Sequence, residues 1–340
     1  MKGLGAFTGL YKGVVKFKNY LYDEEYFQAL ELPIPVLSIG NLTMGGTGKT
    51  PLTDYCLKHY SSKNLKIAVI SRNYRADVRD MAKVNIHREN AGKYYGDEPT
   101  MIAQKNPGVD VFVGPEKFET AQFALETVAP ELLIIDDGFQ HRKLHRDLDI
   151  VILDATEDRA NYECVPTGRA REPFANLSRA SAIVITKVNL VPADEVRKLA
   201  AEVSSAFGKP VFCFAYDLVR LIPNVTGLHR LLKDCRGMKC HLVSAIGRPE
   251  TFEKSIAGFG ITVAKHHVFS DHHAYSAEDV SSMIRELRAA GLNDLITTEK
   301  DFVKLKPLWP ATVPLWVAPL EVHLQGQEDS FHEILDQILH

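Results

Sequence analysis

A glycine-rich segment ahead of Lys49 and Thr50 has the residue types needed to hold the phosphates of a nucleotide. An apolar run leads into three glycines between positions 45 and 48, and a helix is expected to begin at the lysine. Backbone N–H groups in such a turn, with the helix N-terminus behind them, bind phosphate. The lysine adds positive charge at the β- and γ-phosphates, and the threonine hydroxyl faces Mg²⁺. The expected nucleotide-binding residues are Thr43, Met44, Gly45, Gly46, Thr47, Gly48, Lys49 and Thr50.

The segment departs from the usual phosphate-loop pattern at one position. The pattern G-x-x-x-x-G-K-[ST] has glycine first, and here that position is Thr43. Gly45 and Gly46 supply the missing backbone freedom, since glycine tolerates positive φ. A glycine-rich turn without a ligand is the alternative, and the Gly-Lys-Thr ending favours the phosphate loop.

A pair of acids, Asp136 and Asp137, ends an apolar run that begins at Leu132. The arrangement has the form of a Walker B strand, whose carboxylates lie near a metal-bound nucleotide. Two adjacent acids at the end of a buried strand are costly unless a cation neutralises them. Alone, the pair is as compatible with a surface turn. Together with the phosphate loop it predicts one shared site for Mg²⁺ and nucleotide.

Two further segments carry charged residues in compact patterns. Asp97 and Glu98 lie in a turn just before an expected helix, where an N-cap also requires an acid, and composition alone favours the cap. Arg169 and Arg171 stand beside Glu172, so this segment either binds phosphate and helps to hold Mg²⁺ or forms a solvated loop. The fork geometry of arginine slightly favours phosphate.

Four histidines, at positions 266, 267, 272 and 273, fall within eight residues. A metal site, acid–base chemistry and a solvated loop all remain open, because the spacing lacks a zinc signature and composition shows no geometry. A different segment, Thr186 to Asn189, is similar to the guanine-reading element of GTPases. Asn189 stands where that element has its carboxylate, which disfavours a GTPase.

Regular alternation of apolar runs and helical patterns positions these residues. Strands are expected at 66–71, 110–114, 132–136, 148–154 and 180–186, and helices at 51–60, 98–106, 116–127 and 193–206. Strands that alternate with helices predict a doubly wound, mostly parallel α/β sheet of the P-loop NTPase type. Ligands bind such a sheet at the carboxyl ends of its strands, where the polar residues lie.

The chain divides into three expected parts. Residues 1–22 form an N-terminal helix, residues 23–220 form the P-loop domain, and residues 221–340 form a smaller α/β domain that begins with a connector at 221–227. Residues 4, 7, 11, 14 and 21 of the first part are apolar at helical spacing, and its only charges are lysines. A basic amphipathic helix suits an anionic membrane surface, and a helix packed on the domain is the open alternative.

Composition excludes several classes of protein. With 340 residues, 45% apolar and 24% charged, and a net charge of −3, the chain can form cores and is neither a generally basic nucleic-acid binder nor a disordered acidic chain. No nucleic-acid partner is therefore expected. Five cysteines without a CxxC pair predict a reducing compartment and make zinc improbable. No signal peptide is expected at the N-terminus.

Taken in order, the motifs resemble those of the tetraacyldisaccharide 4'-kinase family of lipid A biosynthesis. The segments that carry the resemblance are 38–51, Gly96-Asp-Glu-Pro99, Asp136-Asp-Gly-Phe-Gln-His-Arg142, 168–173, Phe269-x-Asp-His-His-x-Tyr275 and Thr298-Glu-Lys-Asp301. The resemblance implies transfer of the γ-phosphoryl group of ATP, with Mg²⁺, to the 4'-hydroxyl of an acylated glucosamine disaccharide 1-phosphate. It further implies a peripheral protein on the anionic, cytoplasmic face of the bacterial inner membrane, with no obligate protein partner.

The resemblance also assigns roles to residues. The family's catalytic Asp falls on Asp97 and its partner His on His272, whereas Lys49 and Arg171 meet the charge on the transferring phosphoryl group. Candidates for the metal shell are Thr50, Asp136, Asp137 and Glu172. The turn at 72–75 departs from the family's Arg-Gly-Tyr-Gly, which leaves acceptor contacts there in doubt. The alternative function is a P-loop ATPase or GTPase of the metal-insertion kind that uses the histidine cluster.

Overall fold

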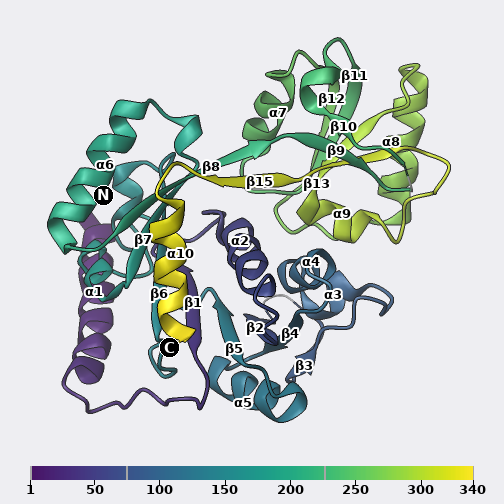
Figure 1. Cartoon of the computed structure of the whole chain (residues 1–340). Helices are drawn as coiled ribbons and strands as arrows, with labels where there is room; N and C mark the ends of the chain where they lie inside the picture. The colour runs from purple at the N-terminus through teal and green to yellow at the C-terminus, as the bar shows by residue number, and fades with distance from the viewer. Residues whose placement is uncertain (1, 74–75, 226, 340) are drawn as a thin grey trace.

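The computed structural model describes residues 2–73, 76–225 and 227–339. Two sheets, each covered by helices, form two lobes, and the carboxyl-terminal lobe lies above the phosphate-loop helix α2 (Figure 1). The first lobe contains the phosphate loop and the paired acids, and the second contains the histidine-rich segment.

In the described residues the first sheet has nine strands in the order β15-β8-β7-β6-β1-β5-β2-β4-β3. All neighbouring strands are parallel except the two edge strands β3 and β15, which are antiparallel to their partners. The predicted doubly wound, mostly parallel sheet is thereby confirmed. The strands are β1 (Val36–Asn41), β2 (Ile67–Arg72), β3 (Ala82–Lys83), β4 (Asp110–Gly114), β5 (Leu132–Asp136), β6 (Leu148–Asp154), β7 (Ala182–Thr186), β8 (Val211–Leu218) and β15 (Leu320–Leu324).

Helices cover both faces of this sheet because both faces of its central strands are apolar. On one face Tyr60 of α2 and Phe331 of α10 join the same buried cluster as Leu37 of β1. On the other face Ala121 and Ala124 of α5 pack against β2, β4 and β5. The helices of this lobe are α1 (Lys2–Asp23), α2 (Lys49–Ser61), α3 (Ala91–Tyr95), α4 (Asp97–Lys105), α5 (Lys117–Val128), α6 (Ala193–Phe207) and α10 (Glu328–Asp336).

The second sheet has the strand order β10-β9-β14-β13-β11-β12 among the residues described. Its strands are β9 (Arg220–Pro223), β10 (Arg230–Leu231), β11 (Lys239–Ser244), β12 (Thr262–Val268), β13 (Leu295–Thr298) and β14 (Leu315–Ala318), and its helices are α7 (Pro249–Ala257), α8 (Ala277–Ala289) and α9 (Glu299–Leu305). A capping box formed by Ser276 and Asp279 begins α8. The apolar faces of α8 and α9 pack with Val243 and Leu295 of the sheet.

The structure differs from the predicted domain boundary at the end of the chain. Strand β15 pairs with β8 in the first sheet, and Phe331 and Leu335 of α10 are fully buried in the first lobe. The residues from 320 onward therefore return to the first lobe, although the prediction grouped 221–340 as one domain. Residues 221–223, expected to be a connector, belong to β9. A local pattern shows that a segment is a strand but not which sheet it joins, because the pairing is non-local.

Candidate active site

The phosphate loop connects β1 to α2, and its glycines occupy positions that need them. Gly48, the residue before α2, has φ of +92°, and a Cβ there would collide with the ring of Tyr216. The Tyr216 hydroxyl also donates a 2.7 Å hydrogen bond to the Gly48 carbonyl. Gly45 has φ of +113°, with the guanidinium of Arg169 at the position of its missing Cβ. Only glycine fits both positions without strain.

Side chains at the end of β7 hold the loop from outside. Thr186 donates from its hydroxyl to the Thr47 carbonyl at 2.9 Å, and Lys187 donates from Nζ to the Gly46 carbonyl at 2.9 Å. Asn189 bonds to the backbone of Tyr216 in β8. The segment that is similar to a guanine-reading element thus supports the phosphate loop and the neighbouring strand.

Asp137 lies between two cations at the carboxyl edge of the sheet. Arg171 donates to both of its carboxylate oxygens at 2.7 Å, and Lys49 Nζ lies 3.5 Å from Oδ1. Lys49 and Arg171 both also contact Asn41, the last residue of β1. Burial acts to raise the pKa of Asp137, but Lys49 and Arg171 outweigh it and hold that pKa well below its usual range. Asp137 is therefore an anion at neutral pH.

Asp136 has a different environment although it is the adjacent residue. Its Oδ2 accepts a 3.2 Å hydrogen bond from Ser71, and its buried Oδ1 has no hydrogen-bond partner among the described residues. Burial, together with the negative charge of Glu98, outweighs the nearby lysines and raises the pKa of Asp136 to about 6. An unpaired buried carboxylate oxygen calls for a partner. Oxygen donors suit Mg²⁺, so Asp136 and the Thr50 hydroxyl at the start of α2 fit that ion.

Lys117 supports the same strand end, and sequence analysis did not single it out. Its side chain is fully buried at the start of α5, and its ammonium group donates to the Asp136 carbonyl. Burial lowers the pKa of Lys117 to about 8, although Asp136 and Asp137 oppose that shift. The sequence gives no sign that this lysine is buried. Lysine is rarely found inside a protein, so a lysine at the start of a helix is expected to be exposed.

Glu172, predicted to belong to the metal shell, also contacts helix α1. Its buried Oε2 accepts hydrogen bonds from Arg179 at 2.8 Å, Asn176 at 2.6 Å and Asn19 of α1 at 3.3 Å. These three donors engage Oε2 and tie Glu172 to α1, and its place in the metal shell stays a prediction. The sequence pattern could not show these contacts, since Arg179 and Asn176 approach through a 3₁₀ turn and Asn19 is distant in the chain.

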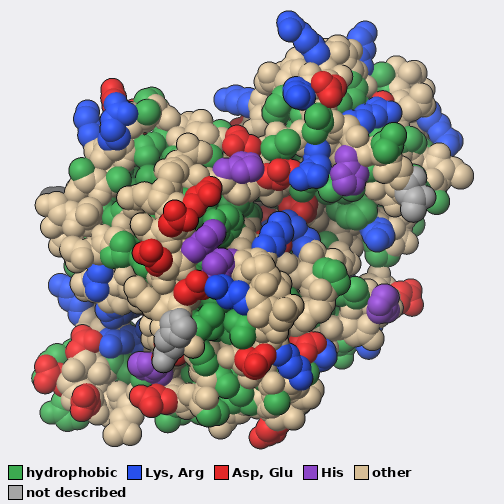
Figure 2. Space-filling model, in the orientation of Figure 1, with side chains coloured by type: hydrophobic (Ala, Val, Ile, Leu, Met, Phe, Trp, Pro, Cys, Tyr) green, Lys and Arg blue, Asp and Glu red, His purple; other side chains and the backbone are tan. Residues whose placement is uncertain are grey.

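Asp97 and His272 come from different lobes and meet between them. Asp97 is the first residue of α4, whereas His272 lies in the loop after β12. His272 Nδ1 lies 3.4 Å from Asp97 Oδ2. Charged and histidine side chains gather between the two lobes on the face that Figure 2 shows. His272 follows the carboxyl-terminal end of β12, and α4, which begins with Asp97, contacts α9 of the second lobe.

The other three histidines of the cluster separate in space. His266 contacts Glu253 and Ser244, His267 contacts His241, and His273 contacts Asp279 at the start of α8. Adjacent strand residues point to opposite faces, which separates the first two. No group of three or more His, Cys, Asp or Glu residues is arranged to hold a metal ion in the described part of the chain.

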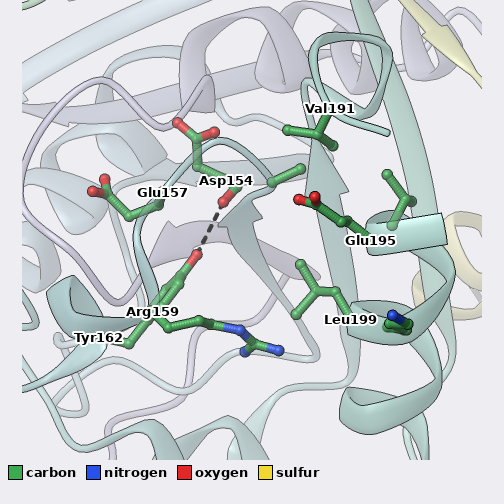
Figure 3. Close-up of a pocket in the computed structure, with 10 residues that line it drawn as sticks. Asp154, Glu157, Arg159, Tyr162, Val191, Glu195 and Leu199 are labelled. Atoms are coloured by element: carbon green, nitrogen blue, oxygen red, sulfur yellow. Dashed lines mark hydrogen bonds between the residues drawn. The ribbon is translucent and has the colours of Figure 1, made fainter. Parts of the chain in front are cut away.

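A separate hollow lies beside the phosphate loop, between the end of β6 and α6 (Figure 3). Asp154, Glu157 and Glu195 line it, and the Tyr162 hydroxyl donates to the Asp154 carbonyl at 3.2 Å. Arg159 and Lys198 line it as well, so its charges do not single out a ligand. The glycine-rich loop has the backbone N–H groups and the lysine that bind phosphates, and the hollow is not assigned to them.

Comparison with known proteins places the chain in a family. The family model for tetraacyldisaccharide-1-P 4'-kinase matches residues 2–340. The chain is 47% identical to a tetraacyldisaccharide 4'-kinase of Bdellovibrio bacteriovorus over 97% of both chains, and 35% identical to one of Chlorobium limicola over 92% of this chain and 89% of that one. This chain belongs to the tetraacyldisaccharide-1-P 4'-kinase family.

A solved structure of the same family has the same fold. It is the "apo" form of the enzyme from Aquifex aeolicus in complex with ATP, with a TM-score of 0.78 and 27% identity over 100% of this chain and 99% of that chain. The resemblance predicted from the motifs is confirmed. The alternative, a metal-insertion ATPase or GTPase, is not supported, because the family match covers the whole fold and the histidines disperse.

The turn at 72–75 is where the sequence departs from the family's Arg-Gly-Tyr-Gly. Arg72 ends β2, and Asn73 donates from its amide to the Val78 carbonyl at 3.0 Å. Tyr74 and Arg75 lie outside the described residues.

Helix α1 packs beside the site through one face only. The Tyr11 hydroxyl donates to the Arg171 carbonyl at 2.8 Å, and Arg142 donates to the Asn19 carbonyl at 2.9 Å. The opposite face exposes apolar side chains to 61–68% of their full area, at Phe7, Leu10, Val14 and Phe17. Tyr11, predicted as part of the apolar stripe, belongs instead to the packed face. None of the described helices is both long and apolar enough to cross a membrane.

Proposed function

We propose that this chain transfers the γ-phosphoryl group of ATP to the 4'-hydroxyl of an acylated glucosamine disaccharide 1-phosphate. Family membership and the names of its relatives give the reaction, and the Aquifex enzyme is known with ATP. The observation that carries the proposal to residues of this chain is the pairing of Asp97 with His272. A carboxylate and an imidazole that meet across two lobes are suited to receive the proton of a sugar hydroxyl.

The phosphate loop and two cations form the proposed donor site. Backbone N–H groups of residues 45–50 bind the triphosphate, and Lys49 contacts its terminal phosphates. Arg171, fixed by Asp137 and Asn41, meets the charge that spreads over the oxygens of the transferring group. Mg²⁺, when held by Thr50 and Asp136, offsets further negative charge on the phosphates. Asp137 holds Arg171 and Lys49 in place.

Asp97 is the proposed base for the acceptor. The 4'-oxygen forms a bond to the γ-phosphorus as the bond from that phosphorus to the β–γ bridging oxygen breaks, and ADP leaves. The hydroxyl proton passes to a carboxylate oxygen of Asp97 and later to solvent. His272 does not touch the acceptor in this proposal. Its Nδ1 lies beside Asp97 Oδ2 and orients this carboxylate.

The exposed face of α1 is proposed to contact the membrane that carries the acceptor. Its apolar side chains project from the side opposite the contacts with Arg171 and Glu172. Lys16 and Lys18 lie on the same helix and add attraction to anionic lipid. The five cysteines are free, which suits the cytoplasmic face of the inner membrane. A protein bound this way is peripheral, and its site lies beside the lipid surface.

The direct test is transfer of radiolabelled γ-phosphate from ATP to purified acylated disaccharide 1-phosphate in detergent micelles. Asp97→Asn and Lys49→Met are each expected to lower kcat by at least about 100-fold. Asp194→Asn, at an exposed position of α6, is the control and should keep wild-type activity. Wild-type protein that hydrolyses ATP but leaves the lipid unlabelled would contradict the proposal.

A further inference from the structure

Two lysines of helix α9 flank the Asp97–His272 pair, one at each member. Lys300 Nζ lies 3.2 Å from His272 Nε2, and Lys304 Nζ lies 3.5 Å from Asp97 Oδ2. Residues four apart on a helix lie on the same face, so one turn of α9 presents both cations to the pair. We propose that Lys300 and Lys304 are positioning residues that fix the charge of Asp97 and the tautomer of His272. This inference rests on the proposed role of Asp97 as the base.

Lys304 is a buried cation held between two carboxylates. Its side chain is 10% exposed, and its ammonium group lies 3.5 Å from Asp97 and 3.4 Å from Asp301. The ring of Tyr275 lies beneath it, with 5.4 Å from Nζ to the ring centroid. A buried cation is costly unless anions surround it, and two nearby buried carboxylates repel each other without a cation. Lys304 therefore offsets the negative charge of both acids.

Asp301 fixes the position of Lys304 because its own oxygens are fully engaged. One accepts from the Ala245 backbone N–H at 3.0 Å and from the Thr298 hydroxyl at 2.7 Å. The other accepts from the Tyr275 hydroxyl at 3.2 Å. Asp301 thus holds Lys304 in place from within the second lobe. The Lys304 ammonium group lies between Asp301 and Asp97 of the first lobe. An ionised Asp97 is the form that can accept a proton from the acceptor hydroxyl.

Lys300 determines which nitrogen of His272 carries the proton. An ammonium group only donates hydrogen bonds, so His272 Nε2, at 3.2 Å from Lys300, must accept. A neutral ring then carries its proton on Nδ1, which faces Asp97 Oδ2 at 3.4 Å. Asp271 holds Lys300 from the other side at 3.3 Å. The protonated Nδ1 of His272 consequently faces Asp97, and this contact orients the carboxylate.

The first test separates catalysis from binding. Lys304→Met is expected to lower kcat about 100-fold, the lower end of what a positioned base contributes, with KM for ATP unchanged. Lys304→Arg keeps a cation there and should recover part of the loss. Lys306→Met, one residue beyond α9 and exposed, is the matched control with wild-type kcat. Wild-type kcat in Lys304→Met, or equal losses in the Met and Arg variants, would overturn the role of Lys304.

A pH profile of kcat gives a readout that a merely structural role would not move. The charged and titratable groups around Asp97 are His272 and Lys304 in direct contact, with Glu98, Lys300, Tyr275, Asp271 and Asp301 behind them. Loss of the Lys304 cation changes the charge 3.5 Å from the proposed base, so the acidic limb of the profile should move. An unmoved limb in a folded Lys304→Met variant contradicts the inference.

The tautomer of His272 can be measured without activity. In ¹⁵N-histidine-labelled protein, with the signal assigned by comparison with His272→Gln, Nδ1 should appear protonated and Nε2 unprotonated. Lys300→Met should give a mixture of tautomers, and the opposite tautomer in the wild type would refute the role of Lys300. Failure of the proposed function is distinguishable: full activity in Asp97→Asn refutes that function, whereas an inactive Asp97→Asn with a fully active Lys304→Met refutes only this inference.

Discussion

Arg171 donates one 2.7 Å hydrogen bond to each carboxylate oxygen of Asp137, and this bidentate pair joins the loop before the 3₁₀ turn at 174–179 to the end of β5. The same guanidinium contacts the Asn41 carbonyl at 3.0 Å at the start of the phosphate loop. The planar guanidinium of Arg171 therefore connects its own loop to the ends of β1 and β5. A lysine ammonium group cannot make these contacts at once, because it is a point charge on a flexible stem.

We expect Arg171→Lys to lower kcat by at least about 100-fold even though the charge is kept, since arginine at this kind of position contributes 10³- to 10⁵-fold in phosphoryl transfer. Steady-state transfer of labelled phosphate to the lipid measures the loss. Arg197→Lys is the control, because Arg197 pairs with Asp194 at the surface of α6. Equal activity of Arg171→Lys and the wild type would show that only charge matters at this position.

Gly48→Ala tests the backbone of the phosphate loop. The residue has φ of +92° and lies against the ring of Tyr216, so a methyl group adds both backbone strain and a collision. The left-handed conformation alone costs about 1–2 kcal/mol for alanine, so the free energy of unfolding should fall by at least that amount. Urea unfolding without nucleotide measures it. Gly46→Ala is the matched control, because no atom lies within 4 Å of a Cβ there and its φ is not positive.

The exposed face of α1 can be tested on lipid vesicles. Phe7→Ser with Phe17→Ser removes two large side chains that are 66% and 63% exposed, and binding to phosphatidylglycerol-containing vesicles should weaken by at least about 10-fold. Sedimentation with the vesicles measures the bound fraction. Leu228→Ser removes an apolar side chain that is 90% exposed on the second lobe, and it should leave binding unchanged. Equal losses in the two proteins would argue that α1 is not the contact surface.

Local patterns in the sequence were sufficient to predict the central sheet. Strands such as β5 and β6 are buried along their whole length, and uninterrupted apolar runs predict that directly. The return of β15 to the first sheet could not be predicted, since it depends on pairing with β8, which lies about a hundred residues earlier in the chain. The short strand β9 was missed because its four residues include a proline.

Site residues could be predicted where a single sequence motif indicates both the type of side chain and its place at the end of a strand or the start of a helix. The structure brings Lys49, Asp137 and Arg171 together, and it places His272 beside Asp97. Glu172 was predicted to belong to the metal shell; the sequence did not show that its Oε2 also accepts from Arg179, Asn176 and Asn19, which no local pattern connects. Lys117 and Lys304 escaped notice for a related reason: their importance comes from burial beside carboxylates, which only the tertiary structure reveals.

The buried pair of imidazoles between β11 and β12 predicts how stability depends on pH. His267 Nε2 lies 3.2 Å from His241 Nδ1, and Glu286 of α8 and Lys265 are its charged neighbours. Burial outweighs the attraction of Glu286 and, with His241, lowers the pKa of His267 to about 4. The unfolded chain, in which this pKa is about 6.5, binds more protons than the folded chain between these values. Acidification from pH 6.5 to pH 4 therefore removes stability, which is fully present above pH 6.5.

Replacement of His267 by glutamine should remove this contribution without adding a charge. The free energy of unfolding of the wild type should fall more steeply between pH 6.5 and pH 4 than that of His267→Gln, because the variant has no proton to bind at this position on unfolding. Urea unfolding at intervals of half a pH unit gives both curves. His323→Gln is the control, since His323 is exposed on β15, and its curve should follow that of the wild type. Parallel curves for the wild type and His267→Gln would mean that His267 gains its proton equally in the folded and unfolded chains, and that burial between the two strands does not shield its ring.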